Sequence, residues 1–384
     1  MSGLYIHIPF CASRCIYCDF YSTTSRNRSL FITQLLNEMK EASRGNVFPE
    51  DALHSIRTIY IGGGTPSLLS CIELQNLVNG LKRNFDLQDV EEFTIELNPE
   101  DVNTAYIREL SPQINRISMG VQSFVDDELQ IIRRRHNSQR PIEAFQILRQ
   151  RGYQNISIDL MYGLPNQTLN SFEYSIDKAI ALRPEHISAY NLTIEDGTPL
   201  NQLYDGTSLH SNGHIYPIPD ENICNEMNML LRRKLKEAGY IQYEISNFAL
   251  PGFASKHNSS YWNSSPYLGL GPGAHSYDGY NHRWWNEPNL EAYLKGQQKI
   301  GEEFLSELDL YNERIMLSLR TREGINVQCL YKDFPTQKTM FIKNAQYMER
   351  RGLLISYQEV GSTYYRLSDK GLPLADYVIR KLMI

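Results

Sequence analysis

Residues 4–20 read LYIHIPFCASRCIYCDF and join a short apolar run to three crowded cysteines. The run over residues 4–8 is typical of a buried β-strand, because it is short and rich in β-branched and aromatic residues. Cys11, Cys15 and Cys18 follow it at once with the spacing C-x3-C-x2-C. Thiolates are soft ligands for iron, and three of them can hold three corners of an iron–sulfur cubane. This pattern predicts a strand that leads directly into a [4Fe–4S] loop, with the fourth iron left open for a ligand.

Two other interpretations of the cysteines stay open at this point. A zinc site needs four ligands, and His7 on the expected strand is the fourth side chain at hand. Three reduced, buried thiols are the second alternative. The other cysteines, Cys71, Cys224 and Cys329, are scattered singly and do not suggest a disulfide framework.

Beyond the cysteines, β-rich runs alternate with amphipathic helical runs as far as about residue 195. The expected strands cover residues 4–8, 57–61, 92–97, 116–120, 156–160 and 186–192, and the expected helices cover 29–43, 72–84, 103–110, 138–151 and 168–182. Such alternation implies parallel strands joined by right-handed crossovers. Six units are two short of a complete eightfold barrel. We therefore predict an α/β fold built on an open, partial (β/α)6 barrel, with its ligands at the carboxyl ends of the strands.

The rest of the chain divides into two further parts. Residues 201–305 are rich in Gly, Pro, Asn and Tyr around one strong helical segment at 219–238, which predicts an irregular α+β extension that covers the open barrel. Residues 306–384 predict helices at 309–321, 326–333 and 338–351, β runs at 353–358 and 363–367, and a last helix from Ser368. This order is typical of a small winged-helix-like domain. The expected domains are thus 1–200, 201–305 and 306–384.

Composition limits the class of protein. The 384 residues are 41% hydrophobic and 21% charged, with a net charge of −6, which is ordinary for a globular protein and gives no overall attraction to nucleic acid. No signal peptide and no apolar run long enough to span a membrane are expected, so the predicted location is the cytoplasm.

Four further motifs lie at or near the carboxyl ends of the expected strands. The second strand ends in the glycine loop Gly62–Thr65, and glycines let a backbone approach a ligand closely. Glu96 emerges at the end of the third strand, and Gln122 follows the fourth. Asp159 lies within the apolar fifth strand, where a charged group needs a partner. Each motif alone is also compatible with an ordinary turn or a solvated residue.

Together these motifs resemble the coproporphyrinogen oxidase-like branch of the radical SAM superfamily, over essentially the whole chain. In that superfamily the open iron chelates S-adenosylmethionine (SAM), and an electron from the reduced cluster cleaves it. The resemblance implies that the cluster is bound by Cys11, Cys15 and Cys18. It implies that SAM is contacted by Tyr5, Tyr17, Gly63, Gly64, Thr65, Glu96, Gln122, Arg134 and Asp159. Arg134 is chosen among three consecutive arginines because it lies twelve residues after Gln122, as in the family pattern.

The branch contains an oxygen-independent coproporphyrinogen III oxidase and the radical SAM haem chaperones of the HemW type. The oxidase pattern has a fourth cysteine where this chain has Phe20, and an N-terminal arm that we do not expect before Tyr5. Residues 257–262 match the H-N-x-x-Y-W motif of the chaperones, which implies haem as a ligand and His257, Asn258, Tyr261 and Trp262 as candidate contacts. His275 and Tyr277 could also line a haem site. The oxidase, or another radical SAM enzyme, is the alternative function.

The same resemblance implies partners. Haem-accepting respiratory proteins are expected, together with peripheral contact to a membrane and assembly as a dimer. Nucleic acid is not expected as a partner. A winged-helix DNA binder with a structural metal is a third hypothesis, and it is weakened by the negative net charge and by the lack of a basic helix face in 306–384.

Overall fold

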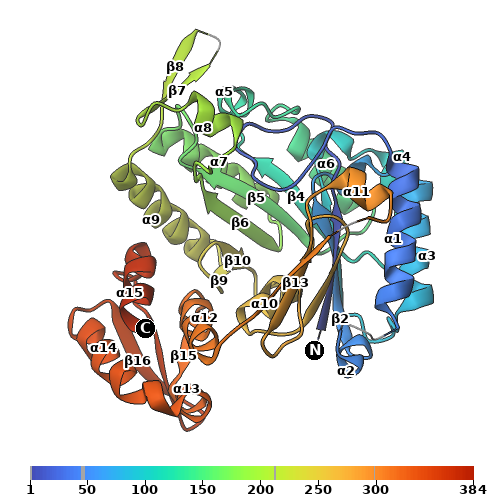
Figure 1. Cartoon of the computed structure of the whole chain (residues 1–384). Helices are drawn as coiled ribbons and strands as arrows, with labels where there is room; N and C mark the ends of the chain where they lie inside the picture. The colour runs from blue at the N-terminus through green and yellow to red at the C-terminus, as the bar shows by residue number, and fades with distance from the viewer. Residues whose placement is uncertain (1, 45–47, 212, 298) are drawn as a thin grey trace.

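The computed structural model describes residues 2–44, 48–211, 213–297 and 299–384. Figure 1 shows a curved sheet with helices on its outer face and a smaller helical lobe at the C-terminal end. The six expected barrel strands are present and lie side by side in chain order. Their bounds are β1 Ser2–Ile8, β2 Ile56–Gly63, β3 Glu92–Leu97, β4 Arg116–Gln122, β5 Ile156–Tyr162 and β6 His186–Asn191.

Neighbouring strands from β1 to β6 all pair in parallel, and the β1–β2 register places Leu4 opposite Ile59 and Ile6 opposite Ile61. These four side chains are fully buried. Parallel strands that are covered on both faces bury nearly every residue, which explains their continuous apolar runs. The predicted α/β class with an open barrel is confirmed.

Helices follow the strands and cover the outer face of the sheet. Their bounds are α1 Arg28–Ala42, α2 Glu50–Leu53, α3 Cys71–Asn84, α4 Thr104–Glu109, α5 Asp126–Ile131, α6 Arg140–Gln150 and α7 Leu169–Leu182, with short 3-10 turns at Pro66–Leu68 and Pro99–Asp101. Each expected helix is present. Helices α2 and α5, which have only four and six residues, were not among those expected from the sequence.

Residues 201–305 carry more regular structure than expected. Four strands extend the sheet beyond β1, where β11 pairs in parallel with β1 and the next three pair antiparallel. Their bounds are β11 Tyr267–Leu270, β12 His275–Tyr277, β13 His282–Asn286 and β14 Ile300–Phe304. Beyond β6, β10 Asn247–Ala249 and β9 Ile241–Gln242 pair antiparallel. These strands have two to five residues, too few to show an alternating pattern in a region of frequent turns.

The same region also holds four helices and a hairpin that projects from the edge of the molecule (Figure 1). Their bounds are α8 Pro199–Leu203, β7 Ser208–Ser211, β8 His214–Pro217, α9 Glu221–Glu237, α10 Lys256–Trp262 and α11 Leu290–Leu294. Met227, Leu231 and Leu235 of α9 are fully buried in the same core as the barrel. The helix predicted at 219–238 thus packs onto the barrel.

The C-terminal part has a second hydrophobic core of its own. It consists of α12 Glu307–Leu319, β15 Ile325–Asn326, α13 Val327–Asp333, α14 Lys338–Arg350, β16 Leu354–Glu359, β17 Ser362–Leu367 and α15 Ala375–Leu382, with 3-10 turns at Pro335–Gln337 and Leu372–Leu374. The last helix begins seven residues later than expected, because Ser368 and Gly371 form a turn closed by hydrogen bonds. Within the described residues, no helix has the length and apolar character that crossing a bilayer requires.

One buried carboxylate on α1 fastens the added strands to the barrel. Glu38 accepts hydrogen bonds from the Gly271 N–H at 2.9 Å, the Asn286 amide at 2.6 Å and the Tyr293 hydroxyl at 2.6 Å. Burial raises the pKa of Glu38 above its usual value, and the three donors oppose that rise. A single side chain therefore connects α1 with the turn after β11, with β13 and with α11.

We expect Glu38→Ala to lower the free energy of unfolding by about 2–4 kcal/mol, because three buried donors lose their acceptor. The measurement is urea denaturation followed by circular dichroism. The matched control is Glu41→Ala on the exposed side of the same helix, which should change stability by no more than about 0.5 kcal/mol. Equal stability of the two variants would contradict the fastening role.

Candidate functional site

The cysteine loop over residues 11–18 leaves the carboxyl end of β1 and is anchored on both sides. The Cys11 N–H donates to the Thr23 carbonyl at 2.9 Å, and the Leu200 N–H donates to the Ile16 carbonyl at 2.9 Å. The Ile16 side chain is buried in a small apolar cluster with Leu200 and Leu209. The loop is therefore shaped by contacts with the rest of the protein before any cofactor is considered.

The three thiols of the loop are half-buried and form no disulfide. Two of the sulfurs lie next to hydrogen-bond donors. The Thr65 hydroxyl is 3.5 Å from the Cys11 Sγ, and Nη1 of Arg134 is 3.5 Å from the Cys15 Sγ. Burial raises the pKa of the Cys18 thiol to about 11. Donors beside sulfur favour thiolate ligands, because they stabilise negative charge on the sulfur atom.

The zinc interpretation of the loop depends on His7, and both ring nitrogens of His7 are already engaged. Nδ1 shares a hydrogen bond with the Tyr5 hydroxyl at 3.0 Å, and Nε2 is 2.8 Å from the Tyr21 carbonyl. In the described part of the chain, no three His, Cys, Asp or Glu side chains gather closely enough to hold one ion. A cubane differs from a single ion, since each thiolate binds a separate iron. The loop thus suits a cluster better than a zinc ion.

The glycine loop at the end of β2 packs directly against the end of β1. A Cβ atom on Gly64 would lie 2.7 Å from the Phe10 carbonyl oxygen and 2.8 Å from that of Ile8. Gly63 has a φ of 106°, a left-handed conformation that L side chains rarely adopt. Only glycine therefore lets β2 end beside the start of the cysteine loop.

Glu96 at the end of β3 links this glycine loop to the barrel interior. It accepts a hydrogen bond from the Tyr60 hydroxyl at 2.7 Å and another from the Gly63 N–H at 3.1 Å. Burial raises the pKa of Glu96 to about 7, against the opposing effect of these donors. The carboxylate is thus held in place and can accept hydrogen bonds from an ammonium or hydroxyl group of a ligand.

Gln122 and Arg134 present polar atoms that no protein group satisfies. A bulge in β4 between Gly120 and Gln122 gives Gln122 a φ of 65°, and its buried Oε1 has no partner. Arg134 donates to Asn98 Oδ1 at 2.8 Å and to the Gly120 carbonyl at 2.9 Å, while its buried Nε has no partner. Buried polar atoms are rarely left unpaired in proteins. Their position beside the cysteine loop fits a polar ligand such as SAM.

One cavity of about 710 Å³ unites these groups. All the residues assigned to the cluster and to SAM from the sequence line it, including Tyr5, Tyr17 and Asp159. Asp159 accepts a hydrogen bond from the Ser118 hydroxyl at 3.3 Å, and burial raises its pKa. The cavity extends beyond them to His257, Asn258 and Tyr261 of α10. Figure 1 shows α10 near the amino-terminal ends of the barrel strands.

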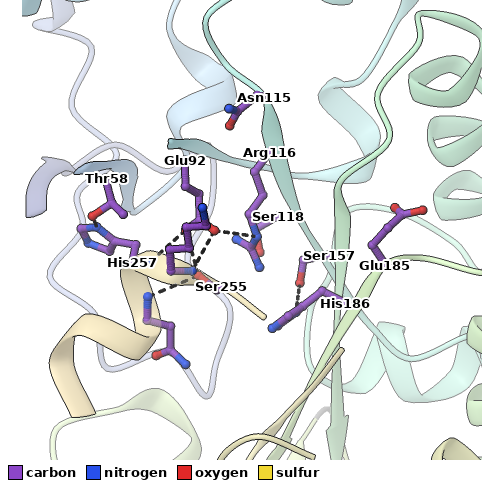
Figure 2. Close-up of polar contacts among 12 residues, drawn as sticks. Thr58, Glu92, Asn115, Arg116, Ser118, Ser157, Glu185, His186, Ser255 and His257 are labelled. Carbon is purple, nitrogen blue, oxygen red and sulfur yellow. Dashed lines mark hydrogen bonds and ion pairs between the residues drawn. The ribbon is translucent and has the colours of Figure 1, made fainter. Parts of the chain in front are cut away.

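The floor of the cavity is built on a buried ion pair between the first residues of β3 and β4. Figure 2 shows Glu92 between Arg116 and the start of α10. The Glu92 carboxylate accepts from the Ser255 hydroxyl at 3.0 Å and from the N–H groups of Lys256 and His257, each at 2.9 Å. The Arg116 Nε lies 4.0 Å from Glu92 and has no hydrogen-bond partner. A carboxylate at a helix N-terminus is favourable, because the free N–H groups there need acceptors.

His257 is packed into this floor with both ring nitrogens occupied. Nδ1 shares a hydrogen bond with the Thr58 hydroxyl at 2.8 Å, and Nε2 shares one with the Tyr261 hydroxyl at 3.0 Å. The ring also stacks on Tyr60, with centroids 5.2 Å apart. Burial lowers the pKa of His257 to about 3, so the imidazole is neutral. In this arrangement His257 has no free nitrogen to offer a haem iron.

Of the other haem candidates, Asn258 and Tyr261 line the cavity beside His257. Asn258 donates to the Tyr243 hydroxyl at 3.3 Å within the cavity. Trp262 and the pair His275 and Tyr277 are not among the residues that line the cavity. His275 on β12 stacks on Trp285 of β13, in the part of the sheet added beyond β1.

Sequence reasoning missed Glu92 and Arg116, which position the motif at 257–262. Each is the first residue of its strand and is almost fully buried. Charged residues at the ends of strands are usually exposed to solvent, so the sequence offered no clear sign that these two are buried. The opposite charges on adjacent strands were the only hint that the two would pair.

Known proteins are similar to this chain over its whole length. The family model described as the radical SAM superfamily matches residues 5–179. The haem chaperone HemW of Lactococcus lactis subsp. lactis is 35% identical, covering 100% of this chain and 97% of that protein. The haem chaperone HemW of Bacillus subtilis is 39% identical over 85% of each chain. The structure of HemN, the coproporphyrinogen III oxidase of Escherichia coli described as a radical SAM enzyme, superposes with a TM-score of 0.81 at 20% identity, covering 100% of this chain and 90% of that one.

We expect Glu96→Gln to reduce the pH dependence of stability. The folded state holds the Glu96 proton more tightly than the unfolded chain, whose pKa is near the ordinary 4.5. Stability from this group is therefore present at low pH and is lost as pH rises from about 4.5 to 7. The variant cannot titrate, so its unfolding free energy should fall less over that window.

The measurement is urea denaturation of the cluster-free protein at several pH values between about 5 and 8. The Asp159 charge contributes to the raised pKa of Glu96, so the difference between the two proteins reports the titration of Glu96 together with its coupling to Asp159. Parallel curves for the two proteins would contradict the raised pKa.

Proposed function

This chain belongs to the HemW family of radical SAM proteins, and on that premise we propose that it is a haem chaperone. It binds a [4Fe–4S] cluster and SAM in the barrel cavity, and it carries haem to acceptor proteins. The observation that carries the proposal is the similarity to HemW relatives from one end of the chain to the other. The likeness to the oxidase structure, at 20% identity, bears on the fold alone.

Cys11, Cys15 and Cys18 are the groups that would hold the cluster. Support comes from their free thiols, from the donors beside two of the sulfurs and from the engagement of His7 elsewhere. Bound by these three thiolates, a cluster would have one iron without a protein ligand, and it would supply redox chemistry to SAM.

SAM would be held by polar groups that line the barrel cavity. Glu96 offers a fixed carboxylate, and the unpaired atoms of Gln122 and Arg134 offer an acceptor and a donor. Gly63 and Gly64 bring backbone groups close to the loop. Tyr5, Tyr17, Thr65 and Asp159 complete the proposed set. The protein's part is to orient the cofactor and to shield it from solvent.

We propose haem as the cargo and respiratory proteins as its acceptors. Haem follows from what the HemW relatives are named for. Phe20, which is 69% exposed, occupies the position of the fourth cysteine in the oxidase pattern. The sequence further predicts respiratory acceptors, a cytoplasmic location, peripheral contact with a membrane and a dimeric state.

Anaerobic reconstitution tests this function. We expect the wild type to take up about four iron atoms per chain and to retain added hemin. Cys11→Ala should lose the cluster and SAM binding, whereas Cys329→Ala, which changes an exposed and isolated cysteine, should keep both. Iron analysis, SAM binding and the haem absorption bands are the measurements. A wild type that retains no haem would reject the chaperone function.

The same preparation addresses the oxidase alternative. With reductant, SAM and coproporphyrinogen III under anaerobic conditions, we expect no decarboxylated product by mass spectrometry. Formation of protoporphyrinogen at a rate that depends on Cys11 would assign the chain to the oxidase.

The assignment of haem to His257, Asn258, Tyr261 and Trp262 stays a prediction that one variant can decide. Because both nitrogens of His257 are bonded within the barrel floor, we expect His257→Ala to retain haem while lowering the melting temperature. Haem titration and thermal unfolding are measured on the same samples. Loss of haem from a folded His257→Ala protein would instead identify the motif as the haem ligand.

A further inference from the structure

A second hollow, separate from the barrel cavity, lies between the barrel and the C-terminal part. It has a volume of about 820 Å³ and is lined by α9 and β9 on one side and by β16, β17 and the residues after α12 on the other. Figure 1 shows α9 and β9 facing this C-terminal lobe. We call it the interlobe cleft. Its size falls within the range of about 300–1,000 Å³ typical of small-molecule sites, which are often found between domains.

The interlobe cleft is strongly basic in a chain whose net charge is −6. Its acidic lining residues are Glu244 and Asp369. Its basic lining residues are Arg232, Arg233, Lys236, Arg320, Arg322 and Arg366. An excess of positive charge inside a concave surface concentrates anions there, because the low-dielectric walls focus the field.

Half of these cations have no acidic partner in the described structure. Arg232 pairs with Asp369, Arg233 with Glu237 and Arg320 with Asp376. Among described residues, Lys236, Arg322 and Arg366 form no ion pair, and Arg366 lies over the Tyr357 ring instead. Their charges are therefore available to a ligand.

Apolar side chains are exposed around the same cleft. Met229 is 61% exposed, Ile241 is 36% exposed and Ile355 is 39% exposed. They come from α9, β9 and β16, and Phe248 and Leu367 form buried walls between them. Exposed apolar groups gathered beside cations are suited to an amphipathic anion, with a flat hydrophobic body and carboxylates at one edge.

The lining also offers one side chain for an iron atom. Met229 and Tyr240 are the lining residues whose side chains are known types of haem ligand. The Tyr240 hydroxyl donates to the Pro184 carbonyl at 2.6 Å and is buried. The exposed thioether of Met229 is the free group.

We propose that the interlobe cleft is the haem site of this protein. The macrocycle lies against Met229, Ile241 and Ile355, and its two propionates pair with the unpartnered cations Lys236, Arg322 and Arg366. This inference rests on the proposed haem-chaperone function. It places the cargo in a site distinct from the cavity proposed for the cluster and SAM.

The test compares hemin with hemin dimethyl ester, in which both propionates are neutral. Titrations use the reconstituted full-length protein. We expect the wild type to bind hemin at least about tenfold more tightly than the ester, because charge-assisted hydrogen bonds are lost with the ester. The double variant Arg322→Glu/Arg366→Glu should bind hemin about as weakly as the wild type binds the ester.

The control is Arg83→Glu/Arg350→Glu, which changes the charge equally at two exposed arginines outside the cleft. It should bind hemin within about twofold of the wild type. Both double variants should keep wild-type iron content and SAM binding. Met229→Leu should shift the absorption bands of bound haem, whereas Met340→Leu on α14 should not.

The outcomes distinguish failure of the cleft assignment from failure of the chaperone function. If the wild type binds hemin and the cleft variants bind it equally well, the cleft assignment is overturned and the chaperone function stands. Equal binding of hemin and its ester by the wild type overturns the assignment too. If the wild type binds phosphatidylserine vesicles and the cleft variant does not, with hemin affinity unchanged, the cleft is a lipid-binding surface instead. A wild type that binds no hemin removes the proposed function itself.

Discussion

The buried carboxylate of Glu92 is the contact on which the arrangement of this molecule depends. It accepts three hydrogen bonds from the start of α10 and lies beside Arg116, so it joins residues more than 160 positions apart in the chain. Taking such a charge out of water is costly, and only a nearly complete set of donors offsets that cost. The donors are available only when α10 closes the floor of the barrel. The buried carboxylate therefore favours the one arrangement in which the extension folds onto the barrel. A purely apolar contact would tolerate more arrangements of the two parts.

Closure of the floor connects the H-N-x-x-Y-W motif with the cofactor end of the cavity. His257 stacks on Tyr60, the Tyr60 hydroxyl donates to Glu96, and Glu96 accepts from the glycine loop beside the cysteines. A neutral, doubly bonded imidazole is well suited to such a structural position. The motif thus has a structural role in shaping the cavity, whether or not it also contacts haem.

The sequence predicted those parts of the fold that repeat a local pattern. The six buried strands, the cysteine loop and the inward position of Glu96 follow from apolar runs and from the residues that end them. The strands β9 to β14 could not be found in this way, because their pairing partners lie far away and each is too short for periodicity. For the same reason Glu92 and Arg116 were overlooked, since a charge at the start of a strand looks solvated until α10 covers it. Long-range burial, which local sequence does not encode, accounts for each of these misses.

Electrostatics gives the two hollows different ligand preferences. The charges that line the barrel cavity nearly balance. Its acidic residues are Asp19, Glu96, Glu100, Asp159 and Glu195, and its basic residues are Arg14, Arg116, Arg134 and Arg135. Burial raises the pKa of Glu96 and of Asp159, because the charged form of each carboxyl loses its hydration there. A ligand with two carboxylates would meet further repulsion there, whereas a sulfonium or ammonium group would be attracted. The interlobe cleft has a clear excess of cations and carries exposed apolar groups. On the proposed function the protein holds a cationic cofactor and an anionic cargo, and the proposed sites place the cargo in the hollow with the larger excess of cations.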